Sequence, residues 1–135
     1  MSGRHEIINP AGLVPPVGYA HAVAAGPGRL VHLGGQAGLD AAGALVGDDL
    51  GTQFDQAASN LVSVLAAAGG SPEDLVSLHI YVTDVGAYRT NLEELGEIYR
   101  RHFDRHFPAV ALFGVGELFD PGALVELVGV AVVPE

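Results

Sequence analysis

The sequence lacks two residue types on which whole classes of chemistry depend. It contains no cysteine, which excludes disulfides, thiolate nucleophiles and zinc or iron–sulfur sites built on cysteine. All six basic residues are arginine, so no lysine is present to hold a carbonyl substrate or pyridoxal phosphate as a Schiff base. The basic residues are Arg4, Arg29, Arg89, Arg100, Arg101 and Arg105.

Positive charge is scarce as well. The formal net charge of −10 at pH 7 repels phosphate backbones, so we expect no nucleic-acid partner. No apolar run reaches the roughly 20 residues that a membrane-spanning helix needs, so we expect no membrane partner. Because the first six residues are polar and no signal-peptide core follows them, we expect a cytoplasmic protein.

Apolar residues are abundant for a chain of this size. The 135 residues suffice for a single domain, 1–135, with one modest core. Hydrophobic residues make up 49% of the chain, only 16% of residues are charged, and the mean hydropathy is +0.34. This balance predicts that some apolar surface is buried against other copies of the chain.

Hydrophobic periodicity predicts an α+β fold. One helix is expected from Thr52 as N-cap to Ala68, where Gly69 and Gly70 stop it, and a second over 88–106. The expected strands are 7–8, 19–24, 29–34, 74–82, 109–115 and 124–133. Strands 19–24 and 29–34 should form a hairpin. The order β-β-β-α-β-α-β-β predicts one mixed β-sheet with two helices packed on one face. The other face should then pack on sister subunits.

Glu126 is the most informative residue, because it interrupts the apolar run 124–133. A carboxylate in such a strand is costly unless it is paired or reached by water. Carboxylates that line a cleft often take part in catalysis. From the strand alone, a chemical role and a structural hydrogen-bonding role at a subunit contact are equally open.

Six segments, taken together and in order, resemble the Rid (RidA/YjgF-type reactive intermediate deaminase) family. The tyrosine-containing strand of the family resembles residues 19–23, and its Ser-Gly-Gln turn resembles 30–36. Its first helix with a glycine stop resembles 60–70, and its strand ending in Thr-Asp resembles 76–84. The end of its second helix with Phe-Pro-Ala resembles 99–109, and its last strand with an acidic residue resembles 125–127. These segments cover nearly the whole chain.

The resemblance implies a chorismate-mutase-like fold and a homotrimer with clefts between subunits. Such proteins hydrolyse enamines and imines from amino-acid metabolism and release ammonia, without a metal or an organic cofactor. By this resemblance, Glu126 would be the catalytic acid–base and Tyr19 would contact the small-molecule substrate. Backbone groups near Val110 and Ala111 would polarise it.

The sequence departs from the family at positions that hold a carboxylate substrate. Val110 replaces the arginine that follows Phe-Pro-Ala, Gly34 replaces the serine of Ser-Gly-Gln, and Gly96 stands where asparagine is common. Valine forms no charge-assisted bond with a carboxylate, so the resemblance implies a substrate other than 2-iminopropanoate-type acids. The alternative is a non-catalytic trimer that binds an apolar or aromatic metabolite.

Three further residues are candidates for the substrate site. His21 lies on the first strand of the predicted hairpin and His32 on the second, so either imidazole could replace the missing cation. A satisfied histidine at the sheet or trimer surface is the alternative. Glu117 lies in the loop that borders the cleft mouth in the family, or is simply exposed. His102 and His106 are four residues apart, but without a third ligand we expect no metal site.

Overall fold

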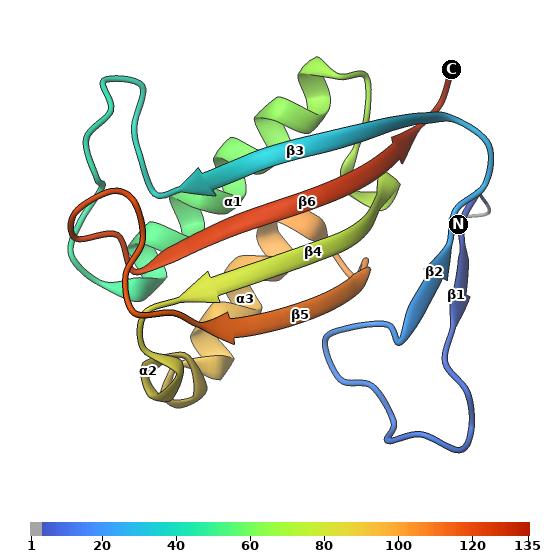
Figure 1. The fold of residues 1–135 in the computed structure, drawn as a ribbon, viewed down its shortest axis with the longest axis horizontal. Coiled ribbons are helices and arrows are strands. Elements are labelled where there is room, and N and C mark those ends of the chain that lie inside the picture. The colour runs from blue at the N-terminus through green and yellow to red at the C-terminus, as the bar shows by residue number, and fades with distance from the viewer. Residues whose placement is uncertain (1–3) are drawn as a thin grey trace.

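In the computed structural model, which describes residues 4–135, a four-stranded sheet carries the helices on one of its faces (Figure 1). The strands are β1 (Glu6–Ile8), β2 (Ala22–Ala24), β3 (Arg29–Ala37), β4 (Leu75–Val82), β5 (Ala109–Gly114) and β6 (Val125–Val133). The helices are α1 (Leu50–Ala67), α2 (Val85–Thr90) and α3 (Leu92–Phe103), with a short 3-10 turn at Pro72–Asp74. Residues 1–3, part of the polar N-terminal segment considered above, lie outside the described residues.

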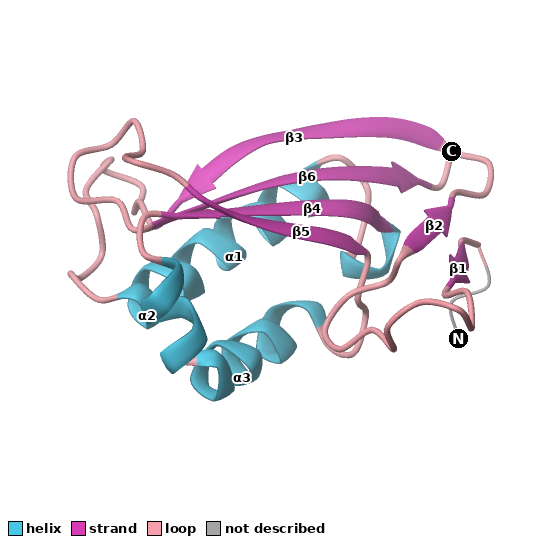
Figure 2. Cartoon of the chain, turned by 60° about the horizontal axis from the view of Figure 1, so that its bottom comes forward, coloured by secondary structure: helices cyan, strands magenta, loops and turns pink. Residues whose placement is uncertain are grey.

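The main sheet is mixed and has the strand order β3-β6-β4-β5. β4 and β5 run parallel, whereas β6 pairs antiparallel with both β3 and β4. Among residues 4–135, the helices lie beneath this sheet and none lies on its upper face (Figure 2). The α+β fold, with a mixed sheet covered by helices on one face, is therefore confirmed.

Side-chain alternation along the strands separates a core face from an open face. Val125 and Leu127 on β6 are fully buried against the helices, whereas Glu126 between them is half-buried on the opposite side. The core side is completed by helix residues such as Phe54 and Phe103, which are also fully buried. This period of two is what a strand half-covered by helices requires.

The N-terminal strands do not form the predicted hairpin. β2 pairs with β1 in a separate two-stranded sheet, and β3 pairs with β6. The segment between β2 and β3 is held instead by the N-terminus, because Arg4 donates to the Pro27 carbonyl at 2.8 Å and Gly26 N–H donates to His5 Nδ1 at 3.0 Å. Arg4 also forms a 2.8 Å ion pair with the buried Asp74. These contacts direct residues 25–28 across the sheet edge rather than into a tight turn.

Two helix boundaries also differ from the prediction. Asp49, not Thr52, caps α1, because its carboxylate accepts a hydrogen bond from Thr52 N–H at 3.1 Å. Hydrogen bonding from the Thr52 side chain and then from its backbone N–H lowers the pKa of Asp49. Gly69, with φ +89°, follows the end of α1 as predicted. The helix expected over 88–106 is two helices, α2 and α3, which meet at Asn91. Within residues 4–135, no helix is both long and apolar enough to cross a bilayer.

Candidate functional site

Glu126 lies on the open face of the sheet, near the start of β6. It is half-buried, and its neighbours across the ladders are Ala37 on β3 and Tyr81 on β4. Within the described chain, no arginine or histidine forms an ion pair with its carboxylate and no donor hydrogen-bonds to it. The carboxylate is therefore neither sealed in the core nor neutralised by a partner.

A two-glycine irregularity in β3 makes room for this carboxylate. The register between β3 and β6 shifts between Leu33 and Gln36, and Gly34 and Gly35 lie at that shift. A Cβ atom at Gly35 would overlap Glu126 Oε2 and lie 2.9 Å from its Cδ, whereas one at Gly34 would meet nothing within 4 Å. Glycine at 35 lets the carboxyl group lie directly against the backbone there.

An aromatic wall stands beside Glu126 on the same face. It consists of His79 and Tyr81 from β4 and Phe113 from β5. Tyr81 stacks on Phe113 with ring centroids 5.5 Å apart, and His79 meets the Phe113 ring edge-on at 5.7 Å. The Tyr81 hydroxyl lies 3.4 Å from His79 Nδ1. The sequence suggested Phe113 as part of an apolar wall but gave no role to His79 or Tyr81, although polar or aromatic residues at alternate positions of β4 were a usable signal.

Val110 faces a different cavity, on the helix-covered side of β5. It pairs with the buried Leu78 and packs against the core. The cavity has a volume of about 440 Å³ and is lined by Val17, Gly18, Tyr19, Ile80, Tyr88, Leu92, Leu95, Gly96, Tyr99, Arg100, Phe107, Val110 and Leu112. Its floor is rigid, because Tyr99 stacks on Phe107 with ring centroids 5.3 Å apart and donates to the His106 carbonyl at 2.6 Å. Burial raises the pKa of Tyr88, so its hydroxyl stays protonated.

The structure places Tyr19 at this cavity, but not on a strand. Residues 19–21 precede β2 and touch the main sheet through a single bridge from Ala20 to Ala109. His21 is engaged locally, with Nε2 2.8 Å from the Val14 carbonyl and its ring edge-on to Tyr19 at 5.2 Å. The expectation that Tyr19 and His21 share a strand face was therefore wrong, because the chain turns before β2 begins.

The remaining predicted residues are dispersed. Ala111 lies on the open face opposite His79 on β4. His32 is exposed on β3, opposite Val130, and its strand does not pair with β2 as the predicted hairpin required. Glu117 is exposed in the loop that joins β5 to β6. Neither His32 nor Glu117 contacts the cavity beside Val110.

The sheet itself separates the two halves of the predicted site. Glu126 pairs with Tyr81 on the open face, and Val110 pairs with Leu78 on the helix-covered face. β4 lies between their two strands. One chain therefore does not bring Glu126 and Val110 into a common pocket.

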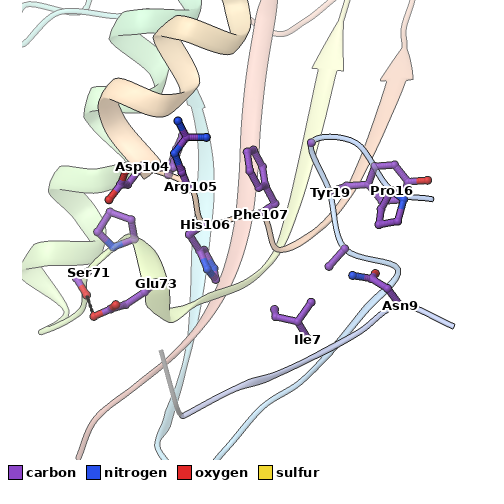
Figure 3. Close-up of a pocket in the computed structure, with 14 residues that line it drawn as sticks. Ile7, Asn9, Pro16, Tyr19, Ser71, Glu73, Asp104, Arg105, His106 and Phe107 are labelled. Carbon is purple, nitrogen blue, oxygen red and sulfur yellow. Dashed lines mark hydrogen bonds between the residues drawn. The ribbon is translucent and has the colours of Figure 1, made fainter. Parts of the chain in front are cut away.

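A larger recess of about 810 Å³ lies between the N-terminal segment and the end of α3 (Figure 3). Ile7, Asn9 and Tyr19 border it from the N-terminal segment, and residues 105–107 border it from the other side (Figure 3). Tyr19 thus borders both this recess and the cavity beside Val110.

His102, near the end of α3, and His106, just beyond that helix, contact separate partners. His102 Nε2 lies 2.6 Å from Asp55 on α1, and His106 Nε2 lies 2.8 Å from the Leu75 carbonyl. Within residues 4–135, no group of three histidine, aspartate or glutamate side chains gathers as candidate metal ligands.

Comparison with known proteins identifies the family. The family model described as Endoribonuclease L-PSP matches residues 11–133. The solved structure of the Yersinia pestis Rid family protein YyfB superposes with a TM-score of 0.87 at 35% identity, covering 96% of this chain and 99% of that one. The chain belongs to the Rid family. The resemblance inferred from its motifs is confirmed, and so is the Rid-type fold.

A protein named as a deaminase is among its relatives. The human 2-iminobutanoate/2-iminopropanoate deaminase is 30% identical over 105 residues, which cover 77% of this chain and 73% of that protein. Protein DfrA of Myxococcus xanthus is 34% identical over 115 residues, which cover 84% of each chain. These relatives support a Rid-type enzyme role at the level of the family.

Proposed function

We propose that this Rid protein hydrolyses a reactive imine or enamine and releases ammonia. The observation that carries the proposal is the unpaired carboxylate of Glu126, held half-buried on an open face beside Tyr81 and Phe113. A carboxylate in that setting can exchange protons with water and with a substrate nitrogen.

The reaction needs one group that moves protons. As a water oxygen attacks the C=N carbon, Glu126 takes the proton that the water loses. The same carboxyl then gives that proton to the nitrogen, and the carbinolamine collapses to a carbonyl compound and ammonia. An enamine reaches the same path after protonation at carbon to give the imine. No redox partner is needed, and we propose that no metal or organic cofactor takes part.

We propose that the working site lies between copies of the chain in a homotrimer. Glu126 and Val110 lie on opposite faces of one sheet, so a pocket that contains both draws them from two chains. The open face offers half-buried Val128 and Val130 as well as the exposed Phe113, which is the apolar surface that association would bury.

Polarisation of the substrate would come from the backbone of β5. This strand is at the sheet edge, and beyond the Ala20–Ala109 bridge its outer side has no partner strand among residues 4–135. Alternate backbone groups near Val110 and Ala111 are therefore free to bind a ligand. The side chain of Val110 adds no charge, so its wall of the pocket does not select carboxylates.

The direct test is ammonia release from imines generated freshly from neutral and acidic amino acids. Glu126→Ala should lower the rate by about 100-fold or more, the usual loss for a general acid–base. Glu93→Ala, which removes an exposed carboxylate on α3, should leave the rate unchanged. Unchanged turnover in Glu126→Ala would remove this residue from the mechanism.

Mixing two inactive variants tests whether the site is shared. Glu126→Ala removes the carboxylate, and Val110→Phe fills the cavity on the other face. If each site takes these residues from different chains, co-refolding the two variants should restore part of the activity. No recovery in verified mixed oligomers would place both residues in one chain's site.

A non-catalytic metabolite-binding trimer is the second candidate. The apolar walls of the 440 Å³ cavity favour it, because such a cavity binds a small apolar body without supplying a reactive group. Thermal stabilisation by a metabolite without turnover would support binding alone.

A further inference from the structure

The cavity beside Val110 contains one cationic side chain, and it comes from a helix rather than from β5. Arg100 of α3 is the only arginine among the residues that line it, and no aspartate or glutamate lines it. The cavity is thus a largely apolar space with a guanidinium at its border.

Gly96 allows Arg100 to reach this position. A Cβ atom at Gly96 would lie 3.3 Å from Arg100 Nη1. Residues four apart lie on the same side of a helix, so the guanidinium folds back over the bare backbone of Gly96, which itself lines the cavity. A larger side chain at 96 would occupy the place of that nitrogen.

The guanidinium of Arg100 has no hydrogen-bonding or ion-pair partner among the described residues. By contrast, Arg4 pairs with Asp74 and Arg101 lies 3.6 Å from Asp55. Arg100 is exposed, so its side chain is free to turn toward a ligand. Such a planar fork binds a carboxylate through two parallel hydrogen bonds.

We propose that Arg100 is the specificity-determining anchor of this cavity, which binds a small monocarboxylate with an aromatic or branched apolar body. The carboxylate contacts the guanidinium, and the body lies against Val110, Leu112 and Phe107. Tyr19 and Tyr88 also line the cavity, and no described residue hydrogen-bonds to either hydroxyl. They are available for a second polar group on the ligand.

Val110, which stands where the family has an arginine, and Gly96 then act together to shape the cavity. Val110 on β5 is shorter than an arginine, and the apolar body of the ligand fills the space that this leaves. Gly96 on α3 has no side chain, so the guanidinium of Arg100 can reach the cavity from the wall opposite Val110. This inference rests on the cavity being the recognition half of the proposed site, and it names the substrate class for that site.

Binding of two probes of the same shape tests it. 3-Phenylpropanoate and its neutral amide, 3-phenylpropanamide, differ only in the charged group, and calorimetry on the purified protein measures both. The carboxylate should bind about tenfold more tightly than the amide, as one charge-assisted contact at a solvent-exposed guanidinium provides. Arg100→Gln should reduce that preference to about onefold, whereas Arg101→Gln, with the same loss of charge one residue away, should preserve it.

Gly96→Leu provides the second variant. Its side chain enters the cavity, so it should abolish binding of both probes while leaving the helical circular-dichroism signal intact. A preference that survives in Arg100→Gln, or a wild-type protein that binds neither probe at millimolar concentration, would overturn the assignment. Because binding is measured without turnover, an Arg100-dependent preference in a protein that releases no ammonia would uphold the anchor and reject the hydrolase.

Discussion

Replacing Gly35 with alanine isolates the contact that positions Glu126. The added Cβ would overlap the carboxylate oxygen, lie 2.9 Å from Cδ and lie 3.3 Å from Cγ. The obstructing atoms are the end of a flexible side chain rather than backbone, so the carboxyl group can rotate away. We expect the free energy of unfolding to fall by only about 0.5–1.5 kcal/mol, the cost of an off-rotamer side chain.

Catalysis should suffer far more than stability. A displacement of about 1 Å at a reacting group costs on the order of 100-fold in rate. Gly35→Ala should therefore lower ammonia release about 100-fold, and in a Glu126→Ala background it should add almost nothing. The coupling energy between the two changes should reach about 2–3 kcal/mol.

Gly34→Ala is the matched control, because its Cβ would meet nothing within 4 Å. It should retain the wild-type rate and midpoint of unfolding. If Gly34→Ala is as damaging as Gly35→Ala, or if Gly35→Ala turns over normally, the carboxylate is not held by this contact.

Three other substitutions test the fold. Asp49→Ala should destabilise α1 by about 1 kcal/mol in denaturant titrations, whereas Asp49→Asn should keep the cap. The pKa of Asp49 in the folded state is lowered below 3.8, so its contribution to the free energy of unfolding is full above that pH and is lost as the pH falls further. If Asp49→Asn showed the same dependence of stability on pH as the wild type, this reasoning would be contradicted. Asp74→Ala leaves Arg4 unpaired and should cost about 1–3 kcal/mol in thermal or urea unfolding, an estimate that fails if the midpoint is unmoved. Phe113→Glu places a charge on the open face and should shift the protein toward monomer in analytical ultracentrifugation with unchanged circular dichroism; an unaltered oligomer would exclude this face from the contact.

Much of the fold could be predicted because long elements carry a strong period. The alternation of β6 and the helical spacing of α1 each extend over many residues, so their identity and their buried faces follow from the sequence. β2 has only three residues, too few to carry a register, and the residues just after it, Gly26 and Pro27, are held by Arg4 and His5 from the N-terminal segment. Asp49 and Thr52 are both good caps, and only the geometry distinguishes them.

In the candidate site, too, some features follow from the local sequence and others depend on contacts between distant residues. Glu126 is evident because a charge in an apolar strand is unusual, and the family motif points to the same position. The role of Gly35 depends on a contact between two strands that are about 90 residues apart in sequence, which no local pattern records. Arg100 was one of several exposed arginines until the structure placed it over Gly96.

The placement of Glu126 and Val110 on opposite sides of one sheet has an evolutionary consequence. A substitution at 110 changes the cavity on the helix-covered side of the sheet and leaves the packing around Glu126 on the open side unaltered. Under the proposed function, ligand recognition at this cavity can change while the residue that moves protons is kept. A lineage could then exchange its ligand through changes at this cavity without rebuilding the surroundings of Glu126.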